Sequence, residues 1–125
     1  MIGLDTNVLV RYIMQDDAKQ AKLATKLIES LNEQSPGFIS LVSIVELCWV
    51  LESAFALSRS QIVEVFQNLM AVDVFKLERV AVVAAAVRDY DEGKAELPDY
   101  LIERSSAQAG CARTMTFDKT AAKTS

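Results

Sequence analysis

With 125 residues, 51% of them hydrophobic and 24% charged, the chain is long enough to bury one core without disulfides, and a single domain over 1–125 is predicted. It contains no stretch of about 18 uninterrupted apolar residues and no N-terminal signal-peptide pattern, so a soluble cytoplasmic protein with no membrane partner is expected. The net charge of −4 argues against broad electrostatic attraction to nucleic acid.

Short apolar segments alternate with segments whose apolar residues recur at helical spacing. In chain order the predicted elements are strand 1–5, helices 6–14 and 16–34, strand 38–41, helices 43–55 and 58–72, strand 73–77, helices 78–94 and 100–110, strand 112–117, and the start of a last helix at 119–123. Gly110 is the predicted end of its helix, because glycine tolerates the positive φ found there. Alternating strands and helices predict an α/β fold, with a mostly parallel sheet of four to five strands covered on both faces.

The residue types that are absent narrow the chemistry. The chain has no histidine, which excludes Ser-His and Cys-His nucleophiles and the commonest ligand of transition metals. Its two cysteines, Cys48 and Cys111, have neither the number nor the spacing of a disulfide or zinc framework. Catalysis would therefore depend on carboxylates, hydroxyls, lysine or an oxygen-ligated metal.

Four acids are expected at one edge of the sheet, since the carboxyl ends of parallel strands meet there. Asp5 ends the first strand, Glu46 lies in the first turn after the second, Asp99 follows Pro98, and Asp118 ends the last strand. Converging carboxylates repel one another unless a cation neutralises them, and ligand sets made only of oxygen suit Mg²⁺ or Mn²⁺. Such a site suits the hydrolysis of phosphodiesters, including those of RNA.

Each acid also has a structural alternative. Ser43 and Glu46 match the capping box S-x-x-E, and Asp5, Asp99 and Asp118 could each cap a helix. Four basic residues are candidates for contacts with the RNA backbone, although Lys and Arg are often only solvated surface: Arg11, Lys94, Arg113 and Lys119.

The segments "IGLDTNVLVRYI", "SLVSIVELCWVL", "LPDYLIERSSAQAGC" and "TMTFDKTAA" resemble the motif blocks of PIN-domain ribonucleases, in particular VapC-type toxins of bacterial toxin–antitoxin pairs. The resemblance runs from Met1 to about Ala122. It implies a PIN-like three-layer sandwich and a Mg²⁺- or Mn²⁺-dependent endoribonuclease that acts on structured RNA such as tRNA. Asp5 and Asp99 would be direct metal ligands, and Glu46 and Asp118 would act directly or through water.

The resemblance also implies roles for neighbouring residues and for partners. Thr6, Asn7 and Thr116 would orient the carboxylates or a water molecule. A homodimer and a cognate, VapB-like antitoxin protein that blocks the site are expected. The alternative is a PIN-like module that binds RNA or protein without cleavage.

Overall fold

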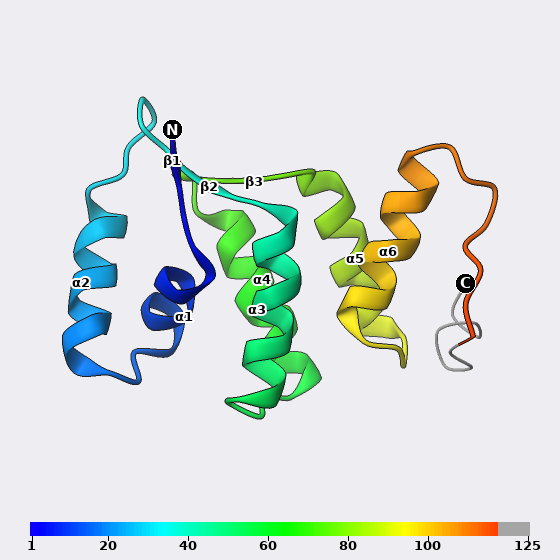
Figure 1. Cartoon of the computed structure of the whole chain (residues 1–125), viewed down its shortest axis with the longest axis horizontal. Coiled ribbons are helices and arrows are strands. Elements are labelled where there is room, and N and C mark those ends of the chain that lie inside the picture. The colour runs from blue at the N-terminus through cyan, green and yellow to red at the C-terminus, as the bar shows by residue number, and fades with distance from the viewer. Residues whose placement is uncertain (118–125) are drawn as a thin grey trace.

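The computed structural model describes residues 1–117, which form an α/β fold with a parallel sheet flanked by helices (Figure 1). The elements are β1 (Ile2–Gly3), α1 (Thr6–Met14), α2 (Ala18–Glu29), β2 (Gly37–Ile39), α3 (Leu41–Ser53), α4 (Arg59–Ala71), β3 (Phe75–Leu77), α5 (Val80–Glu92) and α6 (Leu97–Gln108). The strands pair in the order β1-β2-β3, and both pairings are parallel. The expected fold class is confirmed.

Close packing at the middle strand depends on a glycine. Gly37 pairs with Ile2 on one side and with Phe75 on the other. A Cβ atom at this position would lie 2.7 Å from Leu4 Cδ1 and 2.8 Å from Leu31 Cδ1. The absence of a side chain therefore lets two leucines pack directly over the strand.

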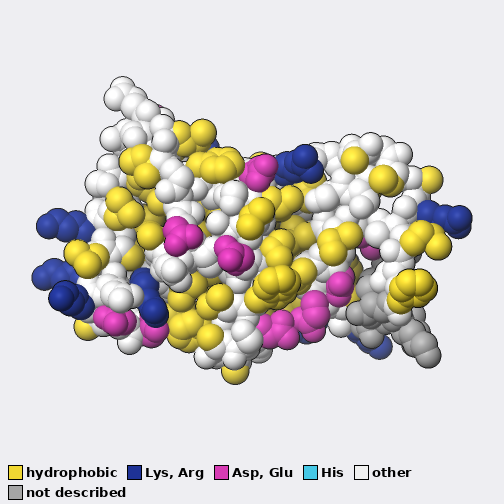
Figure 2. Space-filling view, viewed as in Figure 1, with side chains coloured by type: hydrophobic (Ala, Val, Ile, Leu, Met, Phe, Trp, Pro, Cys, Tyr) yellow, Lys and Arg dark blue, Asp and Glu magenta, His cyan; other side chains and the backbone are white. Residues whose placement is uncertain are grey.

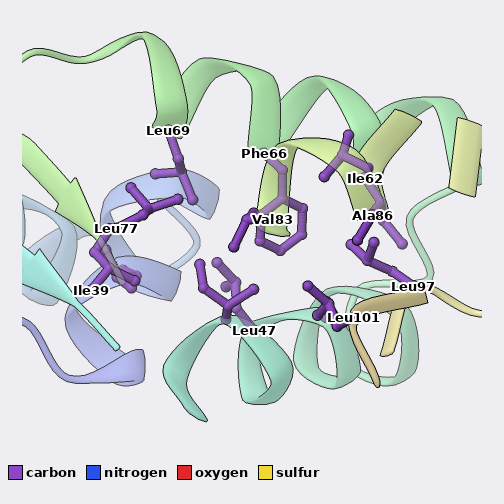
Figure 3. Close-up of a cluster of buried hydrophobic side chains, with 14 of the residues drawn as sticks. Ile39, Leu47, Ile62, Phe66, Leu69, Leu77, Val83, Ala86, Leu97 and Leu101 are labelled. Atoms are coloured by element: carbon purple, nitrogen blue, oxygen red, sulfur yellow. The ribbon is translucent and has the colours of Figure 1, made fainter. Parts of the chain in front are cut away.

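The helices supply most of the core, because the strands are only two or three residues long. Phe66 of α4 is fully buried, and Figure 3 shows its ring near the centre of a cluster that includes Val83 of α5 and Leu47 of α3. Ile39 brings the end of β2 into the same cluster. No helix within residues 1–117 has both the length and the apolar character needed to cross a membrane.

Two helices begin earlier in the chain than predicted, and capping explains both cases. The third helix begins at Leu41 and not at residue 43, because Ser40 is its N-cap and the Ser40 side chain accepts a hydrogen bond from Ser43 N at 3.1 Å. The sixth helix begins at Leu97 and not at residue 100, because Glu96 is its N-cap and the Asp99 side chain accepts a hydrogen bond from Glu96 N at 3.2 Å. Pro98 lies in the first turn, a position where proline is well tolerated.

The predicted strand over 112–117 is not formed, and the sheet of residues 1–117 has three strands instead of four or five. Gly110 does follow α6 with the expected positive φ of 100°. From there the chain runs along the far side of α6, at the opposite end of the molecule from β1 (Figure 1). It meets no strand that could complete a ladder, and Met115 and Phe117 are exposed. Asp118 and the helix expected at 119–123 lie outside the described residues.

Candidate functional site

Asp5 connects the end of β1 to the start of α1. Its backbone is extended, with φ −73° and ψ 152°, and its carbonyl oxygen accepts hydrogen bonds from Val8 N at 3.0 Å and Leu9 N at 3.3 Å. The exposed carboxylate accepts no hydrogen bond from the first turn of α1, all of which the structure describes. The backbone of Asp5 therefore starts the helix, while its side chain is left for solvent or a ligand.

A hydrogen bond joins the residue after Asp5 to Glu46. Thr6 is only 7% exposed, and its Oγ1 donates to Glu46 Oε1 at 2.8 Å, which links α1 to α3. Glu46 is exposed and is the sixth residue of α3, in the second turn and not the first. Because Ser40 is the N-cap, Ser43 and Glu46 do not form the capping box that the sequence allowed. This hydrogen bond joins the helix that begins directly after Asp5 to the helix that carries Glu46.

Asp99 is used differently. It is the third residue of α6, half-buried, and its Oδ2 accepts a hydrogen bond from Glu96 N at 3.2 Å. Its side chain therefore stabilises the start of its own helix, which is the structural alternative for this acid. Within residues 1–117 no three acidic or cysteine side chains form a group that could hold a metal ion.

The loop before α6 is fixed by an arginine that the sequence reading did not single out. Arg59, the first residue of α4, donates to the carbonyl oxygens of Tyr90, Gly93 and Ala95. Its guanidinium carbon also lies 3.9 Å from the centroid of the Tyr90 ring. Since this loop leads directly into α6, Arg59 fixes the position of the helix that carries Asp99. A single arginine at a helix start has no sequence signature that would reveal this role.

A pair of glutamates links the end of α3 to the start of α6. Burial raises the pKa of Glu96 above its ordinary value, and a hydrogen bond with the Glu52 side chain, together with the negative charge of Glu52, raises it further. The nearby Arg59 opposes this shift. The folded protein therefore holds the Glu96 proton to a higher pH than the unfolded chain does, at a position directly before the first turn of α6.

Glu78 is a further acid at the carboxyl edge of the sheet, and the sequence reading missed it. It follows β3 directly, and its Oε1 accepts a hydrogen bond from Leu41 N at 2.7 Å, at the start of α3. The rule that selected Asp5, an acid directly after a strand, would have selected this residue too. Its carboxylate stabilises the N-terminus of the helix that presents Glu46.

The remaining predicted residues are spread over the surface. Arg11 donates to Asp16 Oδ2 and to Gln20 Oε1, each at 2.7 Å, so its guanidinium is already engaged. Asn7 is exposed and lines a shallow groove between α1 and α2. The others are placed as follows: Lys94 is exposed in the loop between α5 and α6, Arg113 and Thr116 are exposed in the segment after α6, and Lys119 lies outside the described residues.

The donors at the end of β1 fit a hard divalent cation. Asp5 and Glu46 offer exposed carboxylate oxygens, and the chain has no histidine that would favour a softer metal. Mg²⁺ is commonly held by one or two carboxylates together with water and substrate phosphate, so two acids suffice to begin such a site. In the view of Figure 2, acidic side chains lie near the middle of the molecule, where Figure 1 shows α3, and most Lys and Arg side chains lie toward the edges. A cation would therefore be attracted to the middle.

Comparison with known families agrees with this arrangement. The family model described as "PIN domain" matches residues 2–125. Comparison with curated proteins found no match, and comparison with solved structures found none either. PIN domains have a nuclease-type fold and generally use divalent metal ions. An exposed acid at the end of the first strand, a parallel sheet flanked by helices, and a match over almost the whole length together show that the chain belongs to the PIN domain family.

Proposed function

We propose that this chain is a Mg²⁺- or Mn²⁺-dependent endoribonuclease that cuts phosphodiester bonds in structured RNA such as tRNA, and that it is the toxin of a toxin–antitoxin pair. The hydrogen bond from Thr6 to Glu46 carries the proposal, because it holds an exposed carboxylate next to the strand end that presents Asp5. The family match supports the nuclease class. The motif segments that resemble VapC-type toxins support the narrower assignment.

Asp5 and Asp99 are proposed as direct ligands of the cation, with Glu46 and Asp118 binding directly or through water. A bound Mg²⁺ or Mn²⁺ supplies positive charge at the scissile phosphate and lowers the pKa of an attacking water. The Thr6 hydroxyl fixes the carboxylate of Glu46, and Asn7 and Thr116 are proposed to orient the other groups. For Asp99 to act as a ligand, its carboxylate must bind the cation with the oxygen that does not cap α6. It must also approach Asp5 and Glu46, because no three acids within residues 1–117 lie close enough in this structure to share a metal ion.

Partners are part of the proposal. A homodimer and a cognate antitoxin protein are expected from the resemblance to VapC-type toxins. The groove of about 250 Å³ between α1 and α2 offers a suitable protein-binding surface, since the exposed side chains of Leu23 and Leu27 line it.

RNA cleavage after induced expression tests the proposed activity. Sequencing of RNA 5′ ends should reveal new cleavage sites in cells that express the wild-type chain, and co-expression of the expected cognate antitoxin should remove them. Asp5→Asn should abolish these sites, lowering the cleavage rate by at least about 100-fold, as expected for loss of a group that stabilises transition-state charge. Asp73→Asn is the matched control, because this exposed acid precedes β3 and lies at the opposite edge of the sheet.

Purified protein gives a second test. Mn²⁺ or Mg²⁺ should raise the Tm of the wild-type chain by ligand linkage, and Asp5→Asn should reduce that increase. If neither metal changes the Tm and RNA remains intact, the nuclease proposal fails. Binding of RNA without cleavage would favour the inactive PIN-like module, for which the capping role of Asp99 is the supporting observation.

A further inference from the structure

The chain has one tryptophan, and its side chain is 61% exposed on α3. Trp49 lies three residues after Glu46, and side chains at that spacing are neighbours on the same face of a helix. Val42, one turn on the other side of Glu46, is 70% exposed. The outward face of α3 therefore presents a carboxylate between two apolar side chains, and the larger of these is an aromatic ring system.

We propose that Trp49 is a stacking platform for an unpaired base of the RNA that is cleaved beside Glu46. The inference rests on the proposed nuclease function and adds a specificity-determining residue to it. The Thr6 hydroxyl fixes the Glu46 carboxylate, so the indole and the proposed reaction centre are held on one rigid helix face. A nucleotide next to the scissile phosphate is within reach of both.

The charge of this surface favours stacking as the source of affinity. A few acidic side chains lie among apolar ones over the middle of the molecule in Figure 2, and most Lys and Arg side chains in this view lie toward its edges. Phosphates are therefore repelled near the reaction centre, except where a cation neutralises them. Stacking on an aromatic ring does not depend on charge, and every base offers a π-face, so an indole can hold a nucleotide without a contact between phosphate and arginine or lysine.

A protein partner fits this position less well than a base does. The apolar side chains of α3 are separated by Glu46, whereas Leu23 and Leu27 lie together along the groove between α1 and α2. Burial of Glu46 in a protein interface would remove a charge from water, and within residues 1–117 no Lys or Arg side chain forms an ion pair with it. A base can stack on Trp49 and leave the carboxylate hydrated.

The platform has a consequence for the choice of substrate. A base must leave its own stack before it can lie on the indole, and paired bases in a duplex cannot do so without loss of pairing. Single-stranded loops and ends should therefore bind, and continuous duplex should not.

Fluorescence of the single tryptophan tests the proposal directly. Full-length Asp5→Asn protein is titrated in Mg²⁺ buffer with an RNA hairpin that has a single-stranded loop, and with a fully paired RNA duplex of the same composition. The hairpin should quench Trp49 and the duplex should not. Equal quenching by both RNAs, or by neither, would overturn the proposal.

Substitutions give the second readout. Trp49→Ala should weaken hairpin binding by about 5- to 150-fold, the range that corresponds to the loss of one base stack, and should raise KM more than it lowers kcat. The factor should be the same at low and high salt. Trp49→Phe should retain most of the affinity, and Val42→Ala on the same helix face should leave it unchanged. Circular dichroism should show that all three variants are folded.

Other results separate the inference from the proposed function. If the wild-type protein cuts RNA and Trp49→Ala cuts it with the same KM, the stacking platform is wrong while the nuclease assignment stands. If the hairpin quenches Trp49 but no protein cuts RNA, the platform stands and the nuclease assignment fails. A blue shift of the emission that depends on protein concentration and not on RNA would place Trp49 between two copies of the chain and overturn the inference.

Discussion

The starts of α1 and α6 carry one predicted catalytic acid each, and the two acids are used in opposite ways. The Asp5 carboxylate makes no bond to the first turn of α1, within the described part of the chain, whereas the Asp99 carboxylate accepts a hydrogen bond from Glu96 N. Figure 1 shows α3, which carries Glu46, between these two helices. An acid at a helix start is thus no sign of function by itself, and the hydrogen-bond partner of its side chain tells the two uses apart.

Of the variants that test the two helix starts, Arg59→Ala should cause the largest loss of stability, because it releases the loop that leads into α6. Three carbonyl oxygens lose their donor, and the Tyr90 ring loses its cationic neighbour. The free energy of unfolding should fall by about 2–4 kcal/mol in urea denaturation. Arg59→Lys should recover only part of this, since an ammonium group cannot reproduce the fork of the guanidinium. A loss below about 0.5 kcal/mol would show that the loop is held by other contacts.

Gly93→Ala tests the same loop by steric means. A Cβ atom at Gly93 would meet the Tyr100 hydroxyl and the backbone oxygen of Asp89. Tyr100 is buried and its hydroxyl accepts a hydrogen bond from Ala95 N at 3.3 Å, so it has little room to move. We expect a loss of about 1–3 kcal/mol in unfolding free energy.

Gly3→Ala is the control on the other side of the molecule. A Cβ atom there would have no neighbour within 4 Å. Thermal unfolding should show an unchanged Tm for this variant and a lowered Tm for Gly93→Ala. Equal Tm values would contradict the packing described for the loop before α6.

A pair of alanine substitutions compares the two acids themselves. Asp99→Ala should lower the unfolding free energy by about 0.5–1 kcal/mol in the absence of metal, because the Glu96 N–H loses its acceptor. Asp5→Ala should change it by less than about 0.5 kcal/mol, since no side-chain bond is lost within the described structure. Urea titrations in EDTA would measure both values. A larger loss for Asp5→Ala would reverse the comparison.

The smallest expected effect is a dependence of folding stability on pH, which comes from Glu96 at the start of α6. The pKa of Glu96 is raised in the folded protein, first by burial and then by the Glu52 carboxyl, so the folded state holds its proton to a higher pH than the unfolded chain does. The contribution of this proton to stability is present below the ordinary pKa of about 4.5 and is lost as pH rises through the raised value.

Thermal unfolding between acid and neutral pH checks this prediction. The Tm difference between the wild-type chain and Glu96→Gln should shift in favour of the variant as pH rises. Glu64→Gln, at an exposed position on α4, should follow the wild-type curve. Parallel curves for wild type and Glu96→Gln would show that the glutamate pair does not titrate as described.

Most helices could be predicted because their apolar periodicity is local. Two helix starts were predicted wrongly, because several polar residues near each start could serve as the N-cap. In the structure Ser40, and not Ser43, is the N-cap of α3, and Glu96 is the N-cap of α6. The residues of 112–117 alone could not show whether this segment forms a strand. A strand of that length needs a partner, and only the path of the chain after Gly110 shows that none is beside it.

The sequence by itself determined the α/β class, the residue types available for chemistry and the place of Asp5 at the end of the first strand, since these depend on periodicity, on composition and on adjacent residues. The tertiary structure alone decided which side chains meet. The bond from Thr6 to Glu46 spans 40 residues, and the one from Arg59 to Gly93 spans 34. Contacts over such separations follow from helix packing, which no local pattern encodes.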